Sequence, residues 1–123
     1  MTIANELEAI MAGMARAYST GDAAGCAALF SETAQLHSSF APPAVGRAEI
    51  EALHDDWLRE PTSKRFDLVE SGGSGDLAWG LFRFAEGHAT GQGSSLAVFT
   101  RINGEWRITA CCLHGDTAES SAE

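Results

Sequence analysis

The sequence predicts an α+β fold in which three N-terminal helices pack on one face of a curved, mainly antiparallel β-sheet. Apolar residues recur at helical spacing in the first half of the chain and follow strand patterns in the second half. Helices that precede a group of strands are typical of α+β domains. The last two predicted strands flank Asn103-Gly104, which suits a two-residue type I′ turn because Asn and Gly tolerate positive φ.

Three helices are expected, in the following order. The first covers residues 3–18, and its apolar stripe consists of Leu7, Ile10, Met11, Met14 and Tyr18. The second begins after Asp22, a good N-cap, and reaches Phe30. After a short strand over 34–40, the third helix covers 48–59, carries His54 within its apolar stripe and is stopped by Pro61.

The strands that follow are expected over 65–71 and 76–88, and then in the hairpin 94–114. If Asn103-Gly104 is the turn, Val98 lies opposite Thr109 and the period of two divides the hairpin into two faces. One face carries Leu96, Val98, Thr109, Cys111 and Leu113, and the other carries Phe99, Trp106 and Ile108. Both faces are apolar, so we expect both to be covered. Arg101 lies opposite Trp106 in this register and is expected to stack on it.

Length and composition restrict the possible functions. The 123 residues suit a single domain over 1–115, followed by a small, acidic tail over 116–123 that we expect to fray. A net charge of −9 disfavours nucleic-acid and membrane partners. Three cysteines, two of them adjacent, suggest reduced thiols and a cytoplasmic protein, and no signal peptide is apparent.

Three segments carry a resemblance to a known family: GDAAGCAALFSETAQLH over 21–37, GRAEI over 46–50 and NGEWRI over 103–108. In order and spacing they resemble the nuclear-transport-factor-two-like superfamily, which includes SnoaL-like proteins and ketosteroid isomerases. The resemblance implies a cone-shaped, cystatin-like α+β fold with a pocket between helices and sheet. It also implies a homodimer that packs through its sheets, here through Phe99, Trp106 and Ile108.

The residues of ketosteroid isomerases are absent from the matching positions. Those enzymes use a carboxylate base, with a tyrosine and a neutral carboxylic acid as hydrogen-bond donors. The matching positions here hold Ser38, Met14 and, approximately, Leu96. SnoaL-like cyclases also rely on an acidic residue in the pocket, and we find no Asp or Glu on a strongly apolar face that could replace it. Isomerase activity of that type is therefore not expected.

The resemblance implies a mainly apolar pocket for a small apolar or aromatic molecule. The expected pocket residues are Met14, Tyr18, Phe30, Ser38, His54, Trp57, Phe82, Leu96, Val98, Thr109, Cys111 and Leu113. His54 and His114 are the candidate acid/base residues, although a hydrogen-bonded core histidine and a solvated strand-end histidine are the simpler interpretations. Cys111 is expected to pack rather than to act as a nucleophile.

No metal or cofactor is expected, because His37, His88 and His114 lack the spacing of metal ligands. Three functions remain open at this point. The first is a domain that binds a small molecule without transforming it. The second is a SnoaL-like cyclase, isomerase or hydratase that uses His54 or His114. The third is a purely structural dimerisation module, which a filled pocket would favour.

Overall fold

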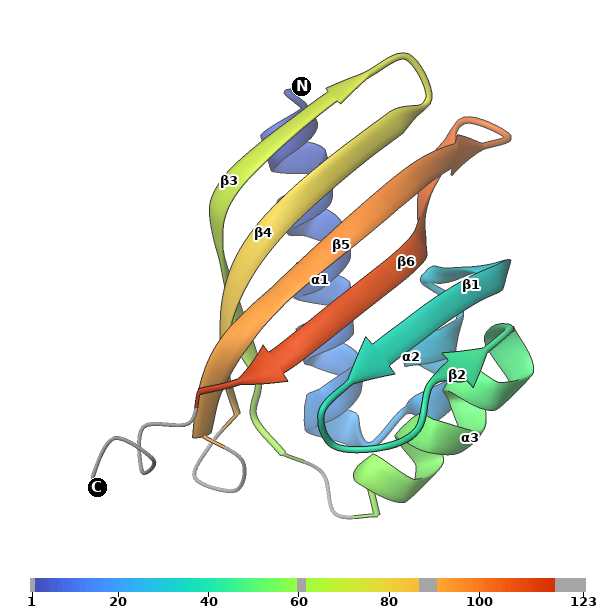
Figure 1. Ribbon diagram of the computed structural model, residues 1–123, viewed down its shortest axis with the longest axis vertical. Coiled ribbons are helices and arrows are strands. Elements are labelled where there is room, and N and C mark those ends of the chain that lie inside the picture. Colours follow the sequence, from blue (N-terminus) through green and yellow to red (C-terminus); the bar gives the residue numbers. More distant parts are fainter. Residues whose placement is uncertain (1, 60–61, 87–90, 117–123) are drawn as a thin grey trace.

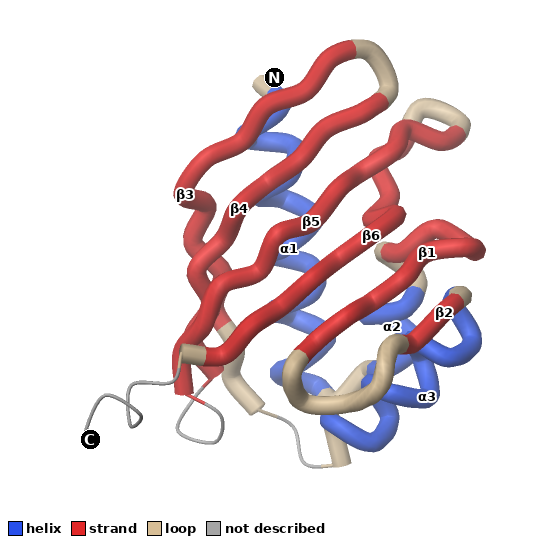
Figure 2. Tube along the Cα trace, viewed as in Figure 1, coloured by secondary structure: helices blue, strands red, loops and turns tan. Residues whose placement is uncertain are grey.

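The computed structural model describes residues 2–59, 62–86 and 91–116. Its elements are α1 (Ile3–Thr20), α2 (Ala23–Ala27), β1 (Phe30–Ser38), β2 (Ala44–Val45), α3 (Arg47–Trp57), β3 (Arg65–Ser74), β4 (Leu77–Glu86), β5 (Gly91–Ile102) and β6 (Glu105–Gly115). The strands form one curved sheet in the order β2-β1-β6-β5-β4-β3 (Figures 1 and 2). Among the described strands, β1 and β6 pair in parallel and the other neighbours pair antiparallel. The predicted fold class is confirmed.

All three helices lie on the same side of the sheet (Figure 1). α1 runs behind the long strands, and α2 and α3 lie behind the end of the sheet that β1 and β2 form. The inner, helix-facing side of the sheet therefore holds the core, and its opposite side is the outer face.

Local signals explain where the helices begin and end. The Thr2 side chain accepts a hydrogen bond from Asn5 N at 3.1 Å and caps α1, which ends at Gly21 with a φ of 67°. Asp22 is the N-cap of α2, as predicted, and accepts from Gly25 N at 2.9 Å. α2 is shorter than expected, because β1 already begins at Phe30. The predicted stop at Pro61 lies outside the described residues.

The predicted hairpin turn has the expected backbone. Asn103 and Gly104 have φ values of 53° and 83°, as a type I′ turn requires. Beside the turn, the Arg101 guanidinium lies 4.3 Å from the centre of the Trp106 ring, so the predicted stacking is confirmed.

The division of the hairpin into two faces was wrong on both sides. The register shifts between Val98 and Phe99: Phe99 pairs with Ile108, but Val98 pairs with Ala110. Thr109 is therefore the extra residue of a β-bulge, and the residues after it change face. The bulge allows Ile108 and Cys111 to point inward together, and both are buried.

The predicted dimer surface is consequently part of the core. Phe99 and Ile108 have no exposed surface, and Trp106 is only 7% exposed. Trp106 Nε1 donates to Glu6 Oε1 of α1 at 2.5 Å, which ties the hairpin to the helix that covers it. These three side chains pack toward the helices and cannot contact a partner subunit through the outer face.

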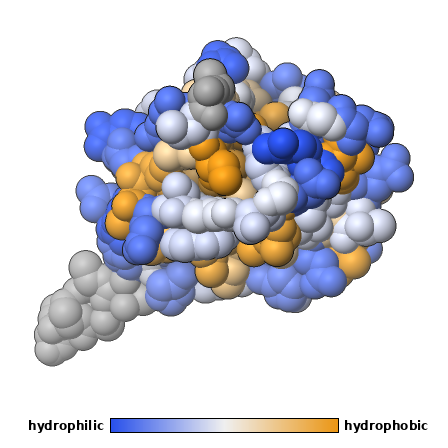
Figure 3. Space-filling view, turned by 90° about the horizontal axis from the view of Figure 1, so that it is seen from above, coloured by the Kyte–Doolittle hydropathy of each residue, from blue (hydrophilic) through white to orange (hydrophobic). Residues whose placement is uncertain are grey.

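The outer face carries a different set of apolar side chains. Trp79 pairs with Val98, and Leu81 pairs with Leu96, on adjacent strands β4 and β5. We call these four residues the outer patch. Leu96 is 45% exposed and Trp79 is 38% exposed. Apolar residues also break the hydrophilic surface at the end of the molecule shown in Figure 3.

Asp116 is the first residue of the predicted tail, and it is hydrogen-bonded to the rest of the fold. Its carboxylate accepts hydrogen bonds from both Arg83 terminal nitrogens at 3.1 and 2.6 Å, and its backbone N donates to Gln92 O at 2.9 Å. The rest of the predicted tail, 117–123, lies outside the described residues, as does His88. In the part of the chain that is described, no helix is long and apolar enough to cross a membrane.

Candidate functional site

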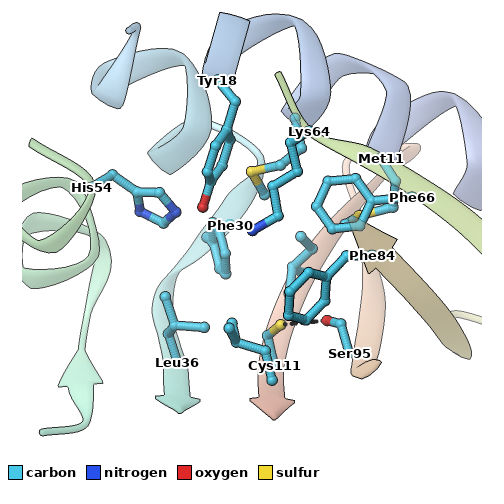
Figure 4. A pocket seen from close by; sticks show the side chains of 13 residues that line it. Met11, Tyr18, Phe30, Leu36, His54, Lys64, Phe66, Phe84, Ser95 and Cys111 are labelled. Carbon is cyan, nitrogen blue, oxygen red and sulfur yellow. Dashed lines mark hydrogen bonds between the residues drawn. The ribbon is translucent and has the colours of Figure 1, made fainter. Parts of the chain in front are cut away.

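A pocket lies between α1, α3 and the concave side of the sheet (Figure 4). Its side chains leave a cavity of about 20 Å³, enough for about one water molecule. A larger ligand therefore requires side chains to move. The lining residues are mainly apolar and are Met11, Met14, Tyr18, Phe30, Leu36, His54, Lys64, Phe66, Phe84, Ser95, Ile108, Cys111 and Leu113.

Half of the residues expected in the pocket do line it. They are Met14, Tyr18, Phe30, His54, Cys111 and Leu113. They come from α1, β1, α3 and β6, so the structure brings together residues from both ends of the chain.

Three other expected residues lie next to the lining but not in it. Phe82 is buried and packs edge-on against Phe66, which lines the pocket, at 6.4 Å between ring centres. Trp57 packs edge-on against His54 at 5.3 Å. Ser38 pairs with Leu113 at the end of β1, and its Oγ accepts from a backbone N–H in the loop that follows.

The remaining three expected residues, Leu96, Val98 and Thr109, do not reach the pocket. The bulge explains this, because the unbroken period of two assigned them to the inner face. The inner positions of β5 are held by Ser95 and Ala97 instead, and both are buried. His114 pairs with Ser94 and is exposed, so it is separated from the pocket. The match that placed Leu96 at the isomerase acid position fails for the same reason.

His54 is a buried, neutral histidine whose ring points toward the Tyr18 hydroxyl (Figure 4). Its Nδ1–H donates to the Ile50 carbonyl oxygen at 2.8 Å, so Nε2 is the unprotonated nitrogen of the neutral ring. Burial lowers the pKa of His54 below its ordinary value of 6.5, although the bond to Ile50 opposes this. His54 is therefore both the hydrogen-bonded core histidine of the simpler interpretation and a group whose Nε2 can accept a hydrogen bond.

Tyr18 and Cys111 are kept in their neutral forms. Burial raises the pKa of the Tyr18 phenol well above its ordinary value, so it remains a donor. Burial also raises the pKa of the Cys111 thiol to about 11, although its hydrogen bond with the Ser95 hydroxyl, at 3.4 Å, acts in the opposite direction. A thiol with so high a pKa is a poor nucleophile at neutral pH. Packing remains the better account of Cys111.

Lys64 is the residue that the sequence analysis missed. Its side chain is 4% exposed, and its Nζ lies 3.2 Å from Glu86 Oε1. Figure 4 shows the amine projecting into the middle of the pocket. Lys64 is also the only lysine in the sequence, and this could have marked it as a candidate site residue. The sequence analysis did not single out Glu86, which ends β4 and is brought to the pocket by its contact with Lys64.

The pocket therefore combines an apolar wall with a neutral base, a phenol and an amine–carboxylate pair. These groups can orient a polar atom of a ligand and exchange protons with it. Among the residues that the structure describes, no group of three or more His, Cys, Asp or Glu is arranged to hold a metal ion.

Comparisons with known proteins agree with this architecture. Residues 11–110 match the model of the SnoaL-like domain. The chain is similar to a domain of unknown function with a cystatin-like fold from Nostoc punctiforme, with 24% identity, coverage of 99% of this chain and 84% of that one, and a TM-score of 0.83. The chain is also similar to an NTF-2-like protein of unknown function from Shewanella oneidensis, with 17% identity and a TM-score of 0.81. The match covers 92% of this chain and 99% of that one.

A ketosteroid isomerase-like protein from Erwinia carotovora has 18% identity, covers 92% of this chain and 95% of its own, and has a TM-score of 0.73. At these identities the likeness concerns the fold alone. No curated protein matches the sequence significantly. The match to the domain model extends over most of the chain, and on that basis the chain belongs to the SnoaL-like domain family within the nuclear-transport-factor-two-like fold.

Proposed function

We propose that the chain binds a small, neutral, mainly apolar molecule in the pocket between α1, α3 and the sheet. One observation carries this proposal: polar groups from three separate segments meet in a pocket whose wall is otherwise apolar. They are the Tyr18 hydroxyl, His54 Nε2 and the Lys64 amine. An apolar pocket with a few convergent polar groups and shifted pKa values is the usual form of a small-molecule site.

The small cavity favours the competing interpretation, a structural module with a filled core. The ion pair of Lys64 and Glu86 argues against it. Replacing a buried ion pair with apolar residues is often neutral or stabilising, so a core that only has to be filled gains little from one. Lysine also has a flexible side chain, and its displacement would enlarge the cavity. Binding of a ligand larger than the cavity would require such a displacement.

Titration with two neutral aromatic probes, p-cresol and indole, tests this proposal. We expect saturable chemical-shift changes in NMR spectra at pocket residues. Cys111→Leu should weaken binding at least about tenfold, because the larger leucine side chain would fill space in a cavity of only about 20 Å³. Cys112→Leu is the matched control, because Cys112 is the next residue and is exposed. Absence of saturable binding to the wild type, or equal losses in both variants, would refute the proposal.

An enzymatic role is the second candidate, and the neutral state of His54 favours it. A histidine with a lowered pKa and a free Nε2 can accept a proton, and the neighbouring Tyr18 phenol can donate one. The reaction would be an isomerisation, cyclisation or hydration of the bound molecule. If a substrate is found, unchanged turnover in His54→Gln would remove His54 from this role.

A homodimer is also part of the proposal, with the outer patch as its interface. The proposed interface is the outer patch because the residues first expected there, Phe99, Trp106 and Ile108, are buried in the core. The patch has apolar side chains side by side on β4 and β5, of which Trp79 and Leu96 are exposed. Leu96→Asp should convert the dimer to a monomer in light scattering at micromolar concentration, whereas a monomeric wild type would refute it. A cytoplasmic location is proposed as well, supported by three free cysteines.

A further inference from the structure

The single lysine of this chain is enclosed by aromatic rings inside the pocket. Lys64 Nζ lies 4.3 Å from the centre of the Tyr18 ring, 4.7 Å from that of Phe84 and 5.4 Å from that of Phe66. Arginines provide every other basic side chain, seven in all, and those at the surface include Arg59 and Arg65, whose side chains are 80% and 77% exposed. The chain thus has exposed arginines at its surface and its one lysine amine in the candidate pocket.

Ionisable groups from five elements surround this amine. Glu86 on β4 forms the ion pair, and Tyr18 on α1, Cys26 on α2, His54 on α3 and Cys111 on β6 are the others. Burial lowers the pKa of Lys64, while Glu86 acts in the opposite direction, and the net change is downward. Desolvation in an apolar pocket is a recognised way to make a lysine nucleophilic.

We propose that Lys64 reacts with a small aldehyde or ketone in this pocket to form a reversible imine. This inference rests on the proposed function, since the carbonyl compound must first bind there. The ligand class is thereby narrowed from any neutral apolar molecule to one that carries an accessible carbonyl group. Glu86 is the proton carrier for the reaction, because its carboxylate already contacts the amine.

The reaction can be balanced with these two residues alone. Glu86 takes a proton from the Lys64 ammonium, the amine lone pair forms a bond to the carbonyl carbon, and the C=O electron pair moves to oxygen. Glu86 returns the proton to that oxygen and then takes one from the nitrogen of the carbinolamine. It finally protonates the hydroxyl group, which leaves as water while the nitrogen lone pair forms C=N. The net change is ammonium plus carbonyl compound to protonated imine plus water.

The charges in the pocket favour a carbonyl compound over a carboxylic acid. A ligand carboxylate would have to compete with Glu86 for the same ammonium and would add a second negative charge to a poorly solvated site. A neutral carbonyl compound adds no charge, so its binding leaves the ion pair intact until the proton transfer begins. The protonated imine that results is again a cation, so both Glu86 and the three aromatic rings continue to stabilise it.

Reductive trapping with benzaldehyde and sodium cyanoborohydride tests the inference. Intact mass and peptide mapping should locate one benzyl group on Lys64, formed at least about tenfold faster than on Nα-acetyllysine, because the pocket holds the aldehyde beside the amine. Lys64→Arg should retain only the slow modification of the α-amino group. The same wild-type protein unfolded in urea provides a control that needs no folded variant, and it should lose the acceleration.

Competition with p-cresol separates this inference from the proposed function. The rate of Lys64 labelling should fall in proportion to the fraction of protein molecules that hold p-cresol in the pocket. If p-cresol binds but Lys64 reacts no faster than free lysine, or if p-cresol does not slow the labelling, the imine inference is refuted and the binding proposal stands. If neither p-cresol nor indole binds and Lys64 is not labelled, both are refuted.

Discussion

Glu86→Gln is expected to break the ion pair with Lys64 and to lower the unfolding free energy by an amount that depends on pH. The substitution keeps the shape of the side chain and removes the negative charge that lies 3.2 Å from Lys64 Nζ. The ammonium is then enclosed by aromatic rings without a carboxylate partner. Removing one partner of a buried ion pair typically costs about 3–5 kcal/mol, because the remaining charge is uncompensated.

The protonation of lysine sets an upper limit on this cost. Instead of remaining charged, Lys64 can lose its proton in the folded variant, and at pH 7 this costs about 5 kcal/mol for a lysine whose ordinary pKa is 10.5. Glu86 is 13% exposed in its side chain, so water can solvate part of the site and reduce the penalty. We therefore expect the variant to lose about 2–5 kcal/mol of unfolding free energy at pH 7.

The sign of the pH dependence follows from linkage. In the variant the folded state favours the neutral amine, whereas the unfolded state keeps the proton up to about pH 10.5. The variant should therefore regain stability relative to the wild type as pH rises, by at most about 1.4 kcal/mol per pH unit. The loss of unfolding free energy relative to the wild type should be close to its largest value at neutral pH and small near pH 10.5.

Urea unfolding of both proteins, followed by circular dichroism between about pH 7 and pH 9.5, measures this difference. Comparison at each pH cancels the shared titration of the cysteines. The double variant Lys64→Met/Glu86→Gln is the control, and its difference from the wild type should lack the regain that the single variant shows. A Glu86→Gln loss below about 0.5 kcal/mol, or one that does not diminish with pH, would show that the pair is effectively solvated.

Three further predictions concern other buried groups. His54 stays neutral when folded, so stability should fall as pH drops below about 6.5, by at most about 1.4 kcal/mol per pH unit, and urea unfolding of His54→Gln should lack that contribution. Iodoacetamide should modify Cys112 at least about a hundredfold faster than Cys111 in the folded protein, as mass mapping would measure; equal rates would contradict the buried position of Cys111. Trp106→Phe removes the hydrogen bond to Glu6 and should cost about 1–2 kcal/mol in urea unfolding, whereas an unchanged stability would show that the bond contributes nothing.

The order of the helices and long strands was predictable because most of them have a local signal, whereas the two-residue strand β2 was not predicted. Asp22 predicts the start of α2 because it is a good N-cap, and Asn103-Gly104 predicts the hairpin turn because both residues accept positive φ. The faces of the hairpin were not predictable from the same pattern. A single extra residue, Thr109, reverses the alternation after Ile108, and both faces are apolar enough to conceal the reversal. A period of two determines a face only where one side is clearly polar.

The site was predictable where a helix or an unbroken strand carries the residue. Met14 and Tyr18 follow from the stripe of α1, and His54 follows from the stripe of α3. Lys64 belongs to neither class, because it precedes β3, whereas Glu86 ends β4 on the same face as Phe82 and Phe84. Only the antiparallel pairing of β3 with β4 brings the two residues together. Their contact depends on tertiary structure, which local patterns do not encode.

The single lysine still had a meaning that a total charge conceals. In the sum of basic residues Lys64 counts the same as an arginine, but its amine can lose a proton and attack a carbonyl group, which a guanidinium at neutral pH cannot do. Arginine, the basic residue that the chain uses at every other position, would also place a cation beside Glu86. Lys64→Arg keeps that positive charge and removes the amine, so trapping with benzaldehyde should be lost at this position. If the variant is still labelled at the wild-type rate, the accelerated reaction belongs to another group and the role of Lys64 is refuted.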